Sequence, residues 1–177
     1  MLKKFLVAFF AIFFLVVAGA YIFVNSVRNP LPQISTLKDY NPPLVSQVYD
    51  RKGKKIGEFF RERRTLVAIG DTPKLVVEAF LAAEDDQFFK HGGINYQSIL
   101  RATIANMRAG RTVQGGSTIT QQVAKTFFLS DERTFDRKLR EALLAVELEK
   151  NLSKEEILYL YLNQIYFGQG AYGIQNA

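Results

Sequence analysis

A long uncharged apolar segment near the start of the chain places the strongest constraint on its architecture. No charged residue occurs from Phe5 to Val27, whereas Lys3 and Lys4 precede this segment and Arg28 follows it. A helix of roughly 20 apolar residues crosses the hydrocarbon core of a bilayer, so the segment is long enough for a transmembrane anchor. The two lysines favour a cytoplasmic N-terminus and place everything after Arg28 outside.

A cleaved signal peptide is the alternative interpretation of the same segment. Ala18-Gly19-Ala20 resembles a cleavage site that follows an apolar core from Phe5 to Val17. The apolar run continues past this site through Tyr21 to Val24, which favours the anchor. Both interpretations export the rest of the chain.

The composition excludes several classes of function. With 177 residues, 48% of them hydrophobic, the chain is long enough for one ordinary folded domain plus an accessory segment. The formal charge of +6 is moderate and the basic residues are scattered, so we expect no nucleic-acid partner. Without cysteine and with a single histidine, the chain offers neither a thiolate metal site nor a multi-histidine centre.

Prolines and short apolar runs organise the next part of the chain. Residues 28–46 hold four prolines among polar residues, which predicts an extended linker without a helix. Two short apolar runs then flank the turn Asp50-Arg51-Lys52-Gly53, so we expect a small hairpin over Val45–Phe60. We therefore divide the chain into a cytoplasmic end (1–4), an anchor (5–27), a linker (28–46) and a catalytic domain (47–177).

Helical patterns dominate after Gly70. Asp71 or Thr72 can cap a first helix that has Pro73 at its first position. A second helix is predicted over Tyr96–Ala109, with an apolar stripe and Gly110 as its stop. A glycine-rich loop then leads into a helix that continues from Val123 to Phe128. Two more helices are predicted, one from a Thr134 cap to about Lys150 and one after the capping box that starts at Ser153.

The acidic triplet at the end of the first of these helices is the leading candidate for chemistry. Glu84, Asp85 and Asp86 follow an apolar run, so a carboxylate emerges beside a face that we expect to be buried. Mutual repulsion and an apolar wall both disfavour the charged form of a carboxyl, which suits a general base. A solvated helix end before a Gly-Gly stop explains the triplet equally well until a second acid is considered.

That second acid is Glu141, which lies in a basic helix downstream. Arg137 and Lys138 precede it by four and three residues, so all three can share one helix face. Ordinary surface ion pairing is the alternative explanation. Lys125 and Arg133 add further cations nearby, which indicates chemistry on a sugar with an anionic leaving group.

Four ordered motifs resemble the signatures of the peptidoglycan glycosyltransferase family. They are Glu84-Asp85-x-x-Phe88-x-x-His91-x-Gly93, Gly115-x-Ser117-Thr118-Ile119-Thr120-Gln121-Gln122, Arg137-Lys138-x-x-Glu141 and Lys154-x-x-Ile157-Leu158-x-x-Tyr161-Leu162-Asn163. The anchor and the segment Asp39–Val45 are further similar to the penicillin-binding protein 1A branch of the class A penicillin-binding proteins.

The resemblance implies a fold, a substrate and a location. The fold is mainly α, a lysozyme-like glycosyltransferase domain with an N-terminal transmembrane helix and a small hairpin. The substrates are lipid II and the growing lipid-linked glycan strand, met at the outer face of the bacterial inner membrane. The partners are inner-membrane lipids, into which an apolar patch on the membrane-proximal jaw dips, and other cell-wall synthesis proteins.

The resemblance also implies residue roles. Glu84 is the base that takes the proton from the acceptor sugar hydroxyl, and Glu141 orients the cations or holds Mg²⁺ or Mn²⁺ against the pyrophosphate; no cofactor is obligatory. Substrate binding falls to Asp85, Ser117, Gln121, Gln122, Lys125, Arg133, Arg137 and Lys138. His91 and Asn163 are structural or indirect, His91 by bonding the glycine-rich turn.

The match has limits, and two other functions compete with it. The chain ends before the family's fifth, arginine-containing motif and contains no Ser-Asp-Asn or Lys-Thr-Gly, and its single Ser-x-x-Lys, at Ser35 and Lys38 in the linker, therefore stands without the two motifs that accompany it in penicillin-reactive domains. We therefore expect an N-terminal part of a larger, bifunctional protein, incomplete at its C-terminal side. A lysozyme-like hydrolase also uses paired carboxylates, and a membrane-anchored scaffold needs no chemistry at all.

Overall fold

The computed structural model describes residues 2–28, 31–32, 34–37, 45–60, 63–132, 134–168 and 170–176. Its principal helices are α1 (Leu2–Arg28), α2 (Lys74–Glu84), α3 (Tyr96–Ala109), α4 (Ile119–Phe128), α5 (Phe135–Asn151) and α6 (Lys154–Gln164). Besides short 3₁₀ turns, the described part of the chain contains five short strands: β1 (Ser46–Tyr49), β2 (Lys55–Phe59), β3 (Arg63–Arg64), β4 (Tyr166–Gly168) and β5 (Ala171–Tyr172). The prediction of a mainly helical fold with an N-terminal apolar helix and a small hairpin is confirmed.

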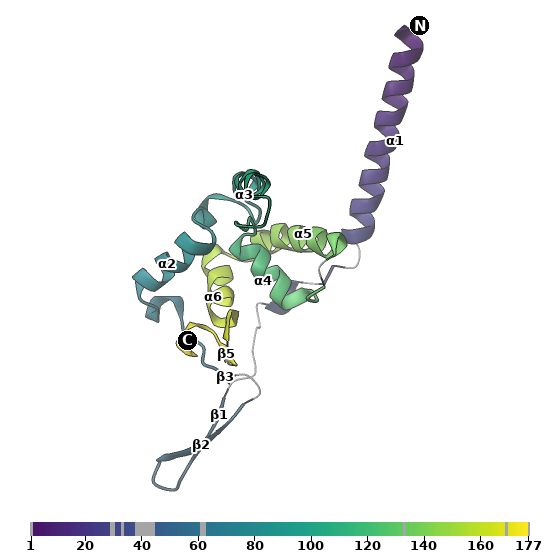
Figure 1. Ribbon diagram of the computed structural model, residues 1–177. Coiled ribbons are helices and arrows are strands. Elements are labelled where there is room, and N and C mark those ends of the chain that lie inside the picture. The colour runs from purple at the N-terminus through teal and green to yellow at the C-terminus, as the bar shows by residue number, and fades with distance from the viewer. Residues whose placement is uncertain are drawn as a thin grey trace.

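The first helix projects away from the folded body, which it contacts at α5 (Figure 1). Its segment Phe9–Ser26 has a mean hydropathy of 2.2, and none of that segment is buried inside the protein. By length and composition, α1 is able to cross a membrane.

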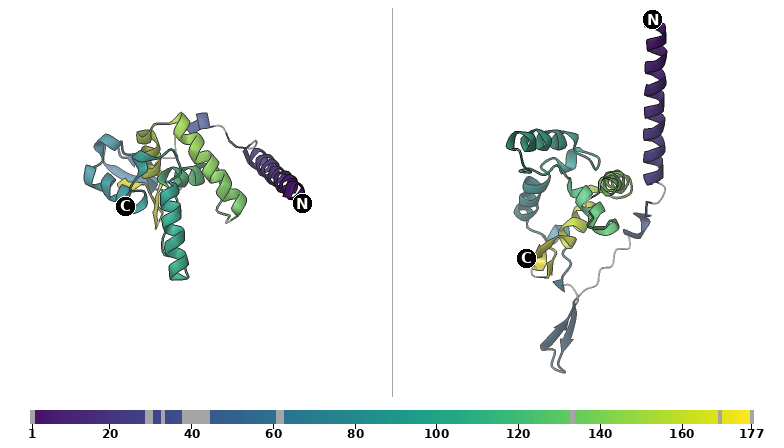
Figure 2. Two further views of the ribbon diagram at one scale, coloured as in Figure 1. Left: turned by 90° about the horizontal axis from the view of Figure 1, so that it is seen from above. Right: turned by 45° about the vertical axis from the view of Figure 1, so that its right-hand side comes forward.

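The predicted hairpin is confirmed and projects from the helical body (Figures 1 and 2). Strand β1 pairs with β2 in antiparallel register, with Ser46 opposite Phe59. In the turn, the Asp50 carboxylate accepts hydrogen bonds from the backbone N–H groups of Lys52 (2.8 Å) and Lys54 (2.9 Å). A local side-chain bond of this kind explains why an aspartate begins the turn.

Helices α4, α5 and α6 form the core of the body. The apolar faces of these helices interlock because the buried positions recur at helical spacing; the buried apolar side chains include Ile119, Val123, Leu144, Leu148, Ile157, Leu158 and Leu162. Two predicted caps are confirmed: Thr134 accepts from Arg137 N at 3.2 Å, and Ser153 forms a capping box with Glu156.

Two local predictions were wrong, and one small sheet was not predicted. The linker does contain a short helix, the 3₁₀ turn Ile34–Leu37, whose two end residues are buried in the core against α5. Neither Asp71 nor Thr72 caps α2, because the Thr72 hydroxyl donates backwards to Ala68 O and Pro73 itself stands at the cap position. The sequence also gave no sign of the small sheet β3-β5-β4. Asp39–Leu44 lies outside the described residues.

The predicted apolar stripe of α3 faces largely outwards. The helix has the predicted bounds, and Gly110 ends it in the left-handed region at φ 63°. Tyr96 is 75% exposed and Met107 is 77% exposed, whereas Ala102 is the one buried residue of the helix. Figure 2 shows α3 at the edge of the body, where few elements cover it.

Candidate active site

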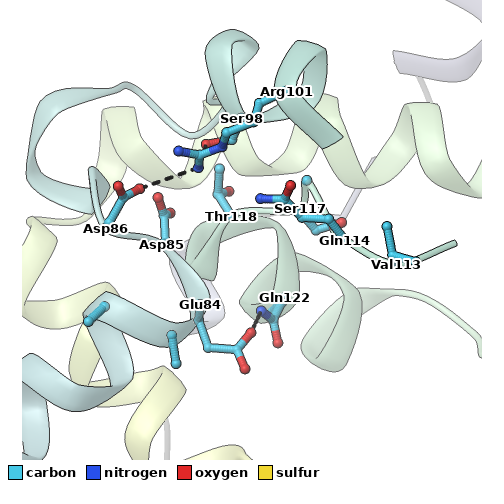
Figure 3. Close-up of a pocket in the computed structure, with 14 residues that line it drawn as sticks. Glu84, Asp85, Asp86, Ser98, Arg101, Val113, Gln114, Ser117, Thr118 and Gln122 are labelled. Atoms are coloured by element: carbon cyan, nitrogen blue, oxygen red, sulfur yellow. Dashed lines mark hydrogen bonds and ion pairs between the residues drawn. The ribbon is translucent and has the colours of Figure 1, made fainter. Parts of the chain in front are cut away.

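A polar cavity of about 610 Å³ lies between the end of α2, helix α3 and the loop that leads into α4 (Figure 3). Its walls carry carboxylates, a guanidinium, hydroxyls and amides; the polar lining residues are Glu84, Asp85, Asp86, Ser98, Arg101, Gln114, Ser117, Thr118 and Gln122. The acidic triplet and the glycine-rich loop, predicted to act together, therefore meet at one cavity.

Glu84 is the last residue of α2 and its side chain is exposed at the wall of this cavity. The side-chain amide of Gln122 donates to Glu84 Oε2 at 2.8 Å, as the dashed line in Figure 3 shows. Ala82 and Ala83 are exposed as well, so the expected desolvation by an apolar wall is wrong. One oxygen of the Glu84 carboxylate is therefore bound by Gln122, and the side chain remains accessible from the cavity.

Asp85, the next residue, is buried and bonded inside the protein. Its carboxylate contacts His91 Nε2 at 2.9 Å and accepts a hydrogen bond from Ile119 N, at the start of α4, at 3.2 Å. A carboxylate is favourable at a helix N-terminus, where the first N–H groups lack helical partners. The partner expected for His91 was the glycine-rich turn, and that expectation was wrong because the imidazole bonds Asp85.

Glu141 is almost fully buried, with 3% of its side chain exposed. Arg137 Nη1 donates to Glu141 Oε2 at 2.7 Å, and Lys138 Nζ pairs with the other carboxylate oxygen. Lys138 Nζ also donates to Ser117 Oγ at 2.7 Å. The predicted shared face is confirmed, and a buried acid here holds two cations in place beside the glycine-rich loop.

A second, more apolar cavity of about 480 Å³ adjoins the first. Its walls are Ile94, Tyr96, Ile99, Ala102, Thr103, Asn106, Gln114, Gly116, Ser117, Gln121, Lys138 and Ala142. Gln114, Gly116 and Ser117 line both cavities, so this loop is the wall that they share. Glu84 lies on one side of the loop, and the Lys138–Glu141 pair lies on the other.

The remaining predicted site residues fall into different surroundings. Gln121 is buried and its side-chain oxygen accepts from Thr118 N at 2.9 Å, in the capping box of α4. Lys125 pairs with the exposed Asp131 at 3.1 Å. Asn163 is fully buried and bonds the backbone of Val67 in both directions. Arg133 lies outside the described residues.

The sequence analysis missed the far wall of the polar cavity. Arg101 on α3 lies 3.7 Å from Asp86 and donates to Ser98 Oγ at 3.1 Å (Figure 3). The spacing of Ser98 and Arg101, three residues apart on the helix that precedes the loop, was a usable signal.

Within the described part of the chain, no three histidine or acidic side chains converge on a point where they could hold a metal ion. The Glu141 carboxylate has both oxygens engaged by cations.

Comparison with known proteins places these features in a family context. The family model described as transglycosylase matches residues 52–177. The chain is 46% identical over 176 residues to penicillin-binding protein 1A of Aquifex aeolicus, covering 99% of this chain and 24% of that protein. It is 42% identical over 181 residues to penicillin-binding protein 1A of Neisseria gonorrhoeae, covering 100% of this chain and 23% of that protein. The chain thus spans about a quarter of the length of these curated relatives.

Proposed function

Because this chain belongs to the transglycosylase family, we propose that it polymerises lipid II into glycan strands as the glycosyltransferase part of a penicillin-binding protein 1A. The reaction forms a bond between the acceptor sugar hydroxyl and the anomeric carbon of the donor, with inversion. Undecaprenyl pyrophosphate leaves with the electron pair of the broken bond. The observation that carries the proposal is the loop that separates the two cavities, because Glu84 lines the cavity on one side of it and Lys138 lines the adjoining cavity.

Glu84 acts as the general base in this proposal. Gln122 fixes one carboxylate oxygen at 2.8 Å, so the other is free to accept the proton of a sugar hydroxyl that enters the polar cavity. The exposed position suits a group that must reach a bulky substrate.

In this proposal Lys138 stabilises the negative charge that develops on the leaving pyrophosphate. Its ammonium group borders the apolar cavity while the buried Glu141 holds it, so a lipid phosphate can place its charge at Lys138 and its lipid towards Ile94, Tyr96 and Ile99. Fixed charges that face a developing anion are commonly the largest catalytic contribution. A divalent ion, if one takes part, would enter bound to the pyrophosphate.

The proposed setting is the outer face of the inner membrane. Helix α1 anchors the protein, and Lys3 and Lys4 favour a cytoplasmic N-terminus. This orientation leaves the two cavities on the side where a lipid-linked sugar is exposed.

The test is polymerisation of labelled lipid II by the detergent-solubilised chain, with Mg²⁺, with Mn²⁺ and with neither, with polymer length determined on a gel. Glu84→Gln should lower the rate by about 10²–10⁴-fold, the usual contribution of a general base. Glu78→Gln on the same helix, an exposed residue whose ion-pair partner among the described residues is Lys74 at 3.4 Å, is the matched control and should polymerise normally. Near-normal rates in Glu84→Gln would exclude this residue as the base.

A further inference from the structure

The loop between α3 and α4 is the element on which both cavities depend. Residues Val113 to Thr118 form neither helix nor strand, yet Gln114, Gly116 and Ser117 line both cavities. At Gly116 the loop lies against α3 so closely that an added Cβ would stand 3.1 Å from Ile99 Cα. Such a loop needs specific contacts to keep one conformation, because ordering each backbone residue costs conformational entropy.

One side chain of α3 supplies three of those contacts. Asn106 Oδ1 accepts hydrogen bonds from Val113 N at 2.7 Å and from Gln114 N at 2.9 Å. Asn106 Nδ2 donates to Gln114 O at 3.0 Å. The amide therefore bonds both polar groups of the Gln114 backbone, and only a side chain with an acceptor and a donor on one carbon can do this.

The other end of the loop is held by different contacts. The Thr118 hydroxyl donates to Gly93 O at 2.6 Å, and Ser117 Oγ accepts from Lys138 Nζ at 2.7 Å. Between the Asn106 contacts and the Thr118 contact, the loop touches the buried Glu141 network through the bond of Ser117 to Lys138. A shift of its first half would move Ser117 away from the lysine that borders the apolar cavity.

We propose that Asn106 is a positioning residue for the donor substrate, acting through the backbone of Val113 and Gln114. This inference rests on the proposed function, because the ligand whose binding it supports is the lipid-linked sugar pyrophosphate. Asn106 itself lines only the apolar cavity, and its amide is committed to the loop. Its contribution is to keep the shared wall in the conformation that presents Ser117 and Gln114 to the substrate, so that binding does not have to order the loop.

The test uses the full chain in detergent with three variants and two measurements. Asn106→Ala removes all three contacts, and Asn106→Asp keeps an acceptor for both N–H groups. Asn151→Ala is the matched control, because in the part of the chain that the structure describes the Asn151 amide bonds Glu147 within its own helix. Amide hydrogen exchange at Val113 and Gln114 reports on the loop. Equilibrium binding of labelled lipid II, with polymerisation at saturating lipid II, separates affinity from kcat.

The expected result is a loss of amide protection and about a tenfold weaker lipid II affinity in Asn106→Ala, as two or three lost hydrogen bonds imply, with a smaller change in kcat. Asn106→Asp keeps the two N–H contacts but sets a carboxylate oxygen against Gln114 O, so it should recover only part of the protection and affinity lost in Asn106→Ala, a graded order that general destabilisation would not explain. Unchanged affinity in Asn106→Ala, or unchanged protection, would overturn the inference. A wild-type chain that binds lipid II without polymerising it would refute the proposed function alone, and one that binds none would refute both.

Discussion

Removal of the Glu141 carboxylate is the sharpest test of the buried charge network. Glu141→Ala leaves Arg137 and Lys138 without their shared counter-ion. The Arg137 side chain is only 15% exposed, and its Nε already has no hydrogen-bond partner among the described residues. Its charge would therefore remain in a poorly solvated position with nothing to balance it.

The expected loss of unfolding free energy in Glu141→Ala depends on how far the two cations are buried. Breaking a buried ion pair by removing one partner costs about 3–5 kcal/mol, because the remaining charge is uncompensated. Lys138 is 44% exposed and can turn its ammonium group to water, which places the expected loss near the lower bound, at about 3 kcal/mol. For a chain of this size that corresponds to a fall in Tm of about 6–12 °C.

Thermal unfolding of the full chain in detergent, followed by circular dichroism, measures this loss. Glu147→Ala on the same helix is the matched control, because Glu147 and Lys150 are 42% and 58% exposed and such pairs contribute under about 1 kcal/mol. High salt should shrink the control effect and leave the Glu141 effect. A Glu141→Ala loss below about 1 kcal/mol, or one that salt abolishes, would refute the picture of a poorly solvated network.

Two further substitutions test the packing around the site by the same unfolding assay. Gly93→Ala should lower the free energy of unfolding by about 2–4 kcal/mol, because the backbone has φ 90° and the new Cβ would lie 2.6 Å from Ala145 O. The control is Gly92→Ala, where the new Cβ meets open space and the loss should be under about 1 kcal/mol. Equal losses in the two variants would contradict this reasoning. Burial, and to a lesser degree the charge of Glu84, raises the pKa of the Tyr161 hydroxyl above its ordinary value of 10.0, so the contribution of this group to stability should be constant below about pH 10 and fall as the pH rises further, where the unfolded chain ionises first. Tyr161→Phe should weaken that alkaline fall and cost little at pH 7, since the hydroxyl has no hydrogen-bond partner among the described residues; an unaltered alkaline fall would contradict the assignment.

Local signals in the sequence predicted the helices well. Gly110 stops α3 where its left-handed conformation is needed, and Thr134 and Ser153 cap the helices that they precede. Each of these features depends on the few residues around it, so no knowledge of the rest of the fold is required. The grouping of Arg137 and Lys138 around Glu141 was predictable for the same reason, because spacing on one helix fixes it.

The exposure of each site residue could not be predicted in this way. The apolar stripe of α3 indicated a buried face, but α3 lies at the edge of the body and Leu100 is 62% exposed. The apolar run before Glu84 likewise predicted a desolvated base, whereas Val76 and Leu75 are exposed and only part of α2 packs on the core. Burial depends on which elements cover a face, and periodicity alone contains no information about that.

The adjacent acids Glu84 and Asp85 acquire opposite environments from a single helix junction. Glu84 is the last residue of α2, and Asp85 leaves the helix with a non-helical backbone at φ −159° and ψ 77°, so the chain direction changes between them. Asp85 then reaches Ile119 N at the first position of α4, while Glu84 meets Gln122 one turn further along the same helix. The first turn of α4 thus binds both acids, one as a buried anchor and one as an accessible base. Since the anchor fixes where the base meets its partner, Asp85 is expected to influence Glu84 through geometry without touching the substrate.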